Sequence, residues 1–109
     1  LAEVEMDVMS LEYLELRVLN TVDKGGAPGM ESSLLKLKGT ECQQAVQSLQ
    51  WDVAAAFGGV LPDEADTDDM GHDFGNAARR EYMFGRASTI YGGSNEVQRN
   101  IIAKFALGL

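Results

Sequence analysis

The sequence is poor in cysteine and in basic side chains, and it has no long apolar run. Cys42 is the single cysteine, which excludes an internal disulfide and is typical of a reducing compartment, so we expect a cytoplasmic protein. Acidic residues outnumber basic ones by 17 to 9, and the net charge of -8 disfavours nucleic acid or an anionic membrane surface as a partner. No apolar stretch approaches the ~20 residues of a membrane span. The first residue is Leu1 rather than methionine, so we expect a segment of a longer protein.

Apolar residues recur at spacings of three and four, which is typical of helices. We find no alternation of apolar and polar residues of the kind that is typical of a strand. Glycine-rich turns interrupt this period, for example at residues 24–29. The 109 residues fit one domain. We therefore predict an all-α antiparallel bundle of about four helices. The expected helices cover residues 1–23, 31–57, 74–91 and 95–107.

The first predicted helix is apolar on two sides. Its main stripe consists of Val4, Val8, Leu11, Leu14, Val18 and Val22. A second stripe through Met9, Leu16 and Leu19 widens the apolar surface. Such a helix is usually covered on both sides. In the second predicted helix, apolar residues recur every seven positions, which indicates a long seam against a neighbouring helix. This seam contains Leu35, Cys42, Leu49 and Ala56, with Val46 and Val53 between them.

Residues 60–73 contain six acidic side chains and no basic one. A calcium-binding loop starting at Asp66 would need oxygen ligands at positions that Met70 and Ala77 occupy. We therefore expect an extended, solvated loop rather than a metal site. His72 lies in this segment without recognisable partners for catalysis or metal binding, so we expect a surface histidine.

Three other chemically capable side chains have simple structural interpretations. Cys42 lies on the helix seam, where a buried and inert thiol is expected. Glu41 and Glu96 are expected to be solvated or capping residues, and Glu96 falls in a first helical turn, where the helix dipole favours a negative charge.

The most informative segment is the turn between the last two predicted helices. Gly92 and Gly93 would allow positive φ or a close approach to a ligand. Asn95 then starts the last helix, and Gln98 stands three residues later, as in a capping box. Backbone N–H groups near Gly93, Ser94 and Asn95 could together bind a polar ligand edge.

The wording of this segment, RASTIYGGSNEVQRNIIAKFALGL over residues 86–109, closely resembles the C-terminal signature of acyl-CoA dehydrogenases. Residues 32–36 (SSLLK) also resemble the family's Ala-Ser-x-x-Lys at the start of its long helix. Residues 40–44 (TECQQ) are similar to members acting on bulky substrates such as steroid side chains. The resemblance implies the C-terminal helical domain of an FAD-dependent enzyme, without its first helix and without the preceding helical and β domains.

The resemblance also implies roles for residues of the turn. Gly93, Ser94 and Glu96 would contact the FAD, and Tyr91 and Gly92 would border the acyl-CoA substrate. The family's catalytic glutamate often stands where this chain has Gly92, so the chain would contribute no base of its own. In some members the base comes from the first helix of the domain. An electron-transferring flavoprotein is the expected acceptor, and a tetramer or dimer the expected assembly.

Other positions depart from the family's pattern. Met83 and Phe84 replace its usual Arg-Asp pair, and Ala55 stands where a glutamine would reach a neighbouring subunit's cofactor. Two alternatives follow. The chain could belong to a non-catalytic subunit of a heteromeric dehydrogenase, or it could be an acidic helical interaction module without cofactor.

Overall fold

The computed structural model describes residues 1–56 and 70–108, and these ranges are helical apart from their turns. The prediction of an all-α fold with four helices is confirmed. None of the helices in the described ranges is long and apolar enough to cross a membrane. The elements are α1 (Ala2–Asp23), α2 (Glu31–Ala56), α3 (Met70–Gly85), the short 3₁₀ helix η1 (Arg86–Thr89) and α4 (Asn95–Leu107).

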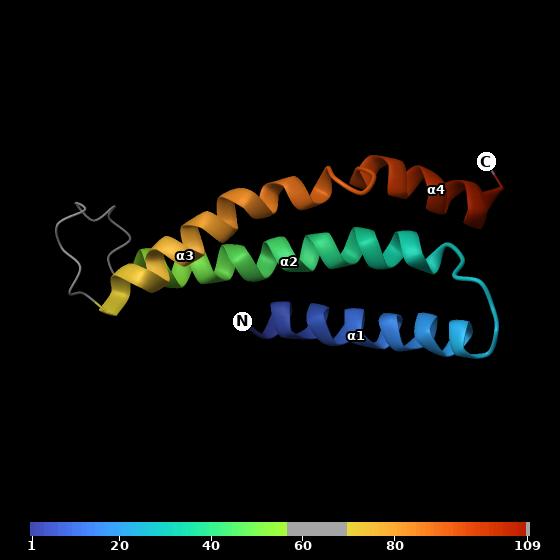
Figure 1. The fold of residues 1–109 in the computed structure, drawn as a ribbon, viewed down its shortest axis with the longest axis horizontal. Helices are drawn as coiled ribbons and strands as arrows, with labels where there is room; N and C mark the ends of the chain where they lie inside the picture. The colour runs from blue at the N-terminus through green and yellow to red at the C-terminus, as the bar shows by residue number, and fades with distance from the viewer. Residues whose placement is uncertain (57–69, 109) are drawn as a thin grey trace.

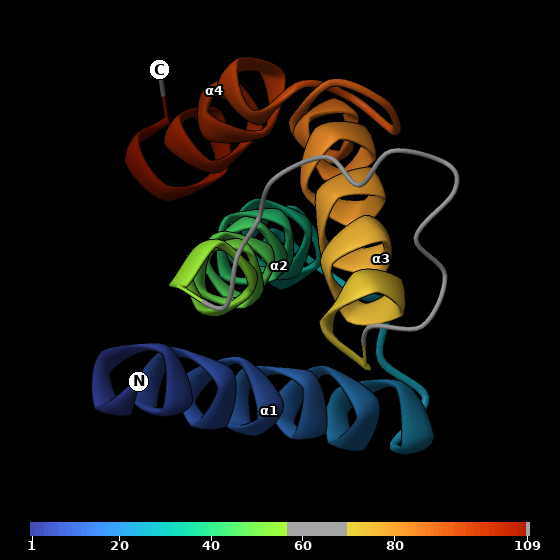
Figure 2. The same cartoon turned by 90° about the vertical axis from the view of Figure 1, so that its left-hand side faces the viewer.

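Helix α2 is the central element of an elongated bundle measuring 57 × 24 × 23 Å (Figure 1). Helix α1 packs antiparallel along one side of α2, while α3, η1 and α4 follow one another along another side. The view along the bundle shows α3 and α4 diverging around α2 (Figure 2). The bundle therefore has three layers of helix: α1, α2, and the succession of α3, η1 and α4. The chain bends between α3 and α4, at η1 and the turn that follows it.

The predicted boundaries hold closely for three helices and fail for α3. Helix α3 begins at Met70, four residues before the predicted start, so the backbone of His72 is helical rather than part of a loop. It ends at Gly85 instead of Tyr91, because the chain tightens there into η1. The acidic segment 60–73, expected to be an extended loop rather than a calcium site, lies outside the described ranges up to residue 69, and residues 70–73 belong to α3 instead of a loop.

The core is small and mixes apolar with polar side chains. Leu37, Cys42, Ala54 and Ala78 are its buried apolar members, and Gln47, Ser88, Asn95 and Gln98 are its buried polar ones. The predicted seam of α2 is correct at Cys42 but not at its C-terminal end, where Val53 and Ala56 are exposed. Because α2 is contacted from several directions, its buried residues are distributed around the helix rather than along one stripe.

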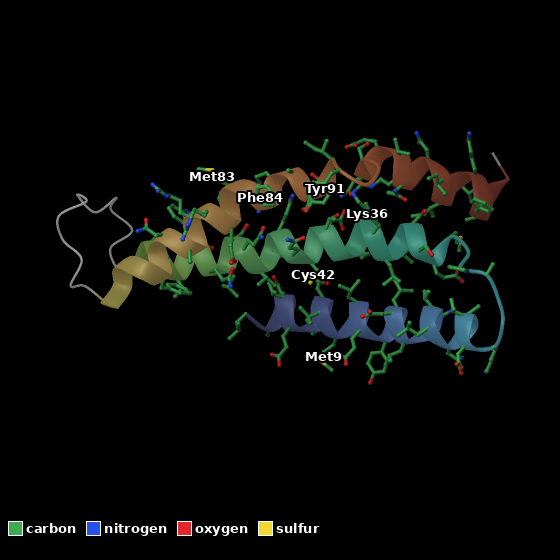
Figure 3. All side chains as sticks on the ribbon, in the orientation of Figure 1. Met9, Lys36, Cys42, Met83, Phe84 and Tyr91 are labelled. Atoms are coloured by element: carbon green, nitrogen blue, oxygen red, sulfur yellow. The ribbon has the colours of Figure 1, made fainter. Side chains whose placement is uncertain are left out.

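Helix α1 buries no residue completely. Its main stripe faces α2 and is partly covered, whereas the second stripe remains largely exposed. Met9, Leu16 and Leu19 of that stripe are each more than half exposed. Met9 projects on the side of α1 that faces away from α2 (Figure 3). The two-sided apolar character predicted for this helix thus leaves one apolar side uncovered in the described residues.

Candidate functional site

The turn between η1 and α4 has a defined backbone. The N–H groups of Ile90 and Tyr91 both donate to the carbonyl of Ala87, at 2.9 and 3.1 Å. Gly92 and Gly93 follow with φ of +68° and +89°. This is the left-handed region, which only glycine adopts without a steric penalty. The prediction that these two glycines allow positive φ is confirmed.

Ser94 is the N-cap of α4, so the predicted start at Asn95 holds for the helix but not for its capping residue. The Ser94 hydroxyl accepts a hydrogen bond from the N–H of Val97 at 3.4 Å, and its carbonyl accepts from the N–H of Gln98 at 2.9 Å. The predicted capping box is wrong. The side-chain amide of Gln98 instead donates to the carbonyl of Gly92 at 3.4 Å, which ties the turn to the helix that follows it.

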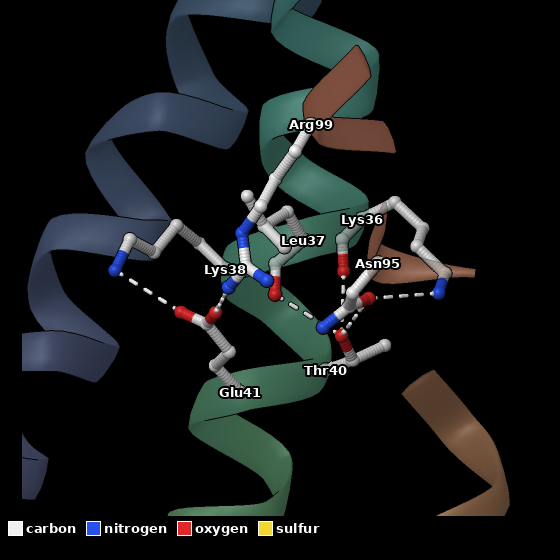
Figure 4. A network of polar contacts seen from close by, with 7 residues as sticks. All are labelled: Lys36, Leu37, Lys38, Thr40, Glu41, Asn95 and Arg99. Atoms are coloured by element: carbon white, nitrogen blue, oxygen red, sulfur yellow. Dashed lines mark hydrogen bonds and ion pairs between the residues drawn. The ribbon is translucent and has the colours of Figure 1, made fainter. Parts of the chain in front are cut away.

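The inner side of the turn is bonded to α2 through a lysine (Figure 4). The Lys36 ammonium donates to the carbonyl of Ser88 and to the Oδ1 of Asn95, both at 3.1 Å. Thr40 lies one turn further along α2, and its hydroxyl lies 3.2 Å from the same Asn95 oxygen. Ser88 is 1% exposed and Asn95 6%. The two ends of the turn are therefore buried against one cation.

A second set of contacts joins η1 to the middle of α2. The side-chain amide of Gln44 donates to the carbonyl of Gly85 at 3.1 Å, and Arg86 donates back to the carbonyl of Gln44 at 3.3 Å. The Arg86 guanidinium also lies 4.4 Å from the ring centroid of Tyr82, which in turn stacks on Trp51. These contacts fix the direction in which the chain enters the turn.

Glu96 is fully exposed in the first turn of α4. Its pKa is lowered first by a hydrogen bond from its own backbone N–H and then by one from Ser94, with smaller contributions from the charges of Arg99 and Lys36. Glu41 lies on α2 and binds Lys38 and Arg99 through ion pairs of 3.1 and 2.8 Å. Glu96 is solvated, as expected, whereas Glu41 is half-buried and links α2 to α4 through Arg99.

The residues predicted to form the site lie on one open edge of the bundle. Tyr91, Gly92, Gly93 and Glu96 are all exposed, and Ser94 is partly buried beneath them. Sequence reasoning missed Asn95 as a buried acceptor and Lys36 as its donor. The only available signal was that Lys36 belongs to the SSLLK motif, a pattern that does not state what its lysine contacts.

The side of α2 that faces α1 carries a buried thiol and a groove rather than the contacts of the turn. Cys42 is buried there and faces α1, away from Lys36 and Tyr91 (Figure 3). Burial raises the pKa of its thiol, and the nearby Asp7 carboxylate adds to this effect. The thiol also borders a groove of about 430 Å³ between α1 and α2. Among the residues that the structure describes, no group of three or more His, Cys, Asp or Glu is arranged to hold a metal ion.

Comparison with known proteins identifies a family for this chain. The family model described as acyl-CoA dehydrogenase, C-terminal domain, matches residues 1–107. The chain is 40% identical over 82 residues to acyl-CoA dehydrogenase IpdE1 of Mycobacterium tuberculosis, a match covering 75% of this chain and 19% of that protein. It is 71% identical over 31 residues to acyl-CoA dehydrogenase IpdE1 of Mycolicibacterium smegmatis, covering 28% of this chain and 8% of that protein. The matches thus span less than a fifth of either relative, and no solved structure matches the chain.

Proposed function

This chain belongs to the acyl-CoA dehydrogenase family, and we propose that it is the C-terminal domain of an enzyme that introduces a double bond between the α and β carbons of an acyl-CoA. The observation that carries the proposal is the turn from Tyr91 to Ser94. Its two glycines hold positive φ, and its inner side is bonded to α2 while its outer side is open.

The residues present fit an FAD edge at the start of α4. Gly93 has no side chain to obstruct a ligand, and Ser94 and Glu96 offer a hydroxyl and a carboxylate beside the helix N-terminus. A carboxylate with a lowered pKa stays ionised at neutral pH and accepts hydrogen bonds from hydroxyl groups such as those of a ribityl chain. FAD, when bound, would supply the acceptor for the hydride leaving the β carbon.

Gly92 would contribute to substrate activation through its backbone. The α-proton of a thioester is weakly acidic, so its removal requires a polarised carbonyl as well as an ordered base. The N–H of Gly92 would donate to the thioester carbonyl, and the exposed ring of Tyr91 would border the acyl chain. Gly92 has no side chain to take the proton. In this proposal the catalytic base comes from a residue outside these 109 residues, either in the same full-length polypeptide or in a partner.

The wider assembly follows from the same proposal. The parent protein would act on an acyl-CoA, pass its electrons to an electron-transferring flavoprotein in the cytoplasm, and assemble as a dimer or tetramer. The exposed apolar side of α1 supports an assembly, because soluble monomers rarely leave large apolar patches uncovered. The same exposed surface would also suit a helical interaction module without cofactor.

A second candidate function is a non-catalytic subunit paired with a catalytic sister chain, and Gly92 favours it. A subunit whose turn contains no base could still contribute its cofactor edge or its packing surface to a heteromer. The two candidates differ in one respect. The first needs an acid elsewhere in the same polypeptide, whereas the second needs an acid in a different one.

The decisive experiment is anaerobic mixing of the purified full-length protein with acyl-CoA while the visible absorbance of the flavin is followed. Bleaching by the protein alone supports the catalytic proposal. Bleaching only after a sister chain is added supports the heteromeric one. A full-length protein that contains no flavin, with or without a sister chain, would refute both and favour the interaction module.

The isolated 109-residue chain should bind FAD weakly and have no dehydrogenase activity, because it presents only one edge of a cofactor site. Titration of FAD with this chain, followed by flavin fluorescence, tests this expectation. A submicromolar dissociation constant would contradict it, since an open edge with three contact residues cannot bury enough of the cofactor to give such affinity.

A further inference from the structure

Lys36 connects the two ends of the turn that carries the proposed cofactor edge. Ser88 is the third residue of the four-residue helix η1, and Asn95 is the first residue of α4. The Lys36 ammonium lies 3.1 Å from the Ser88 carbonyl oxygen and 3.1 Å from Asn95 Oδ1. One charged group on α2 therefore holds residues before and after Gly92 and Gly93. Figure 4 shows its contact with Asn95, the residue after the glycines on α4.

No neighbouring donor replaces this ammonium completely. The Thr40 hydroxyl is within reach of Asn95 Oδ1 at 3.2 Å, but it also lies 3.0 Å from the carbonyls of Lys36 and Leu37. A hydroxyl has a single proton and donates it to one acceptor at a time, whereas an ammonium has three. Loss of the Lys36 ammonium would leave the buried carbonyl of Ser88 without its charged donor, and buried acceptors are costly to leave unpaired.

We propose that Lys36 is a positioning residue, which clamps η1 to α4 so that Gly93, Ser94 and Glu96 are presented to the cofactor in one fixed arrangement. This inference rests on the proposed function. Lys36 does not itself touch the proposed cofactor edge and acts through Ser88 and Asn95. Preorganisation of this kind improves binding because the ligand does not have to order the turn.

The positive charge of Lys36 also favours the ionised form of Glu96. It is among the contributions that lower the pKa of Glu96, after the hydrogen bonds from the backbone N–H of Glu96 and from Ser94 and the charge of Arg99. A positive group behind the turn thus favours the ionised carboxylate on its outer side. The Lys36 side chain thus both holds the backbone of the turn and favours the negative charge of Glu96, which would face the cofactor.

The test compares three variants of the full-length protein. Lys36→Met removes the ammonium and keeps an unbranched apolar stem, whereas Lys36→Arg restores a cation with several donors. Lys38→Met is the matched control, because Lys38 lies two residues away on the same helix and its exposed ammonium pairs with Glu41 instead of the turn. For each protein the FAD dissociation constant and the hydrogen exchange of residues 90–99 are measured.

Lys36→Met should weaken FAD binding by about ten- to a hundredfold, the range expected for losing a charged hydrogen bond to a buried acceptor. Exchange across residues 90–99 should accelerate while exchange in α1 stays unchanged. Lys36→Arg should recover most of both properties, and Lys38→Met should match the unmodified protein. If Lys36→Met fails to fold, Asn95→Ala removes the acceptor on α4 instead and should show the same pattern.

Unchanged FAD affinity in Lys36→Met would overturn the proposal, even if exchange accelerates, because the lysine would then be only structural. An equal loss of affinity in Lys38→Met would overturn it as well. A full-length protein that contains no FAD would instead refute the proposed function. In that case, unchanged exchange over residues 90–99 in Lys36→Met would also show that no clamp exists.

Discussion

Replacing Gly92 by alanine should destabilise the protein through the backbone alone. A Cβ added at Gly92 would meet nothing within 4 Å, so there is no steric contact with a neighbouring side chain to consider. The φ of +68° is the entire obstacle. An L-residue in this region costs about 1–2 kcal/mol. The reduced freedom of the unfolded chain returns about 0.4–1 kcal/mol, so the net loss should be about 1 kcal/mol.

Gly75→Ala is the matched control for this substitution. Gly75 lies inside α3, and a Cβ there also meets nothing within 4 Å. Its backbone is helical, so alanine should stabilise the protein by about 1 kcal/mol. The same chemical change should therefore shift the free energy of unfolding in opposite directions, with a difference of about 2 kcal/mol between the two variants.

Urea unfolding followed by circular dichroism measures both variants against the unmodified protein. A Gly92→Ala variant as stable as Gly75→Ala would show that the turn accepts a side chain and would refute the reasoning. The result also bears on function. An alanine at Gly92 would cost little only at a negative φ, and the observed φ of +68° excludes that case. Gly92→Glu should meet the same backbone cost and should not restore a correctly placed base.

Further predictions concern single features of the structure. Gly85→Ala should destabilise the protein by up to about 2 kcal/mol. Its Cβ would lie 2.5 Å from Cδ of the buried Gln47, and this overpacking outweighs the roughly 1 kcal/mol that alanine gains in helical backbone. Gln47→Ala in the same chain should recover most of the loss in a double-mutant cycle. Glu96→Gln should lower stability at neutral pH. Since the folded-state pKa of Glu96 is lowered, the difference should be complete above the ordinary pKa and disappear as the pH falls through the folded-state value in acid titrations of stability. Cys42 should react with a thiol reagent far more slowly in the folded protein than in urea, and equal rates would contradict its burial. The chain should self-associate through the exposed side of α1, and sedimentation as a clean monomer at high concentration would contradict this.

Sequence periodicity predicted three helices closely because their ends have local causes. Ser94 caps α4, Gly108 ends it with φ of +66°, and the glycine-rich turn after Asp23 stops α1. The end of α3 has only a weak local signal, because Gly85 keeps a helical backbone with φ of -61° and ψ of -20°. The change from α3 to η1 at Gly85 depends on contacts with Gln44, which lies far away in the sequence. Periodicity extended the helix through these residues because nothing nearby interrupts the apolar pattern.

The buried polar residues were beyond the reach of pattern analysis for a related reason. Periodicity assigns the core by counting apolar positions, yet Gln47, Ser88, Asn95 and Gln98 are as buried as the apolar core residues. The side chains of Ser88, Asn95 and Gln98 are each buried with a hydrogen-bonding partner, whereas Oε1 of Gln47 has none among the described residues. For Asn95 that partner is Lys36, 59 residues earlier in the chain. Such pairs are determined by the tertiary arrangement of α2 and α4 rather than by local sequence.

The division between a bonded inner side and an open outer side explains how so exposed a turn can have a defined shape. On the inner side, Ser88 and Asn95 satisfy their oxygens with Lys36, and Gln98 returns to the carbonyl of Gly92. The two Lys36 bonds support the turn from α2 and the Gln98 bond supports it from α4, so no side chain on the outer side is needed to hold it. The turn therefore keeps its shape with glycine, rather than glutamate, at position 92. The shape of this turn and the identity of the residue at position 92 are therefore separable in this chain, because the contacts that hold the turn come from Lys36, Ser88, Asn95 and Gln98.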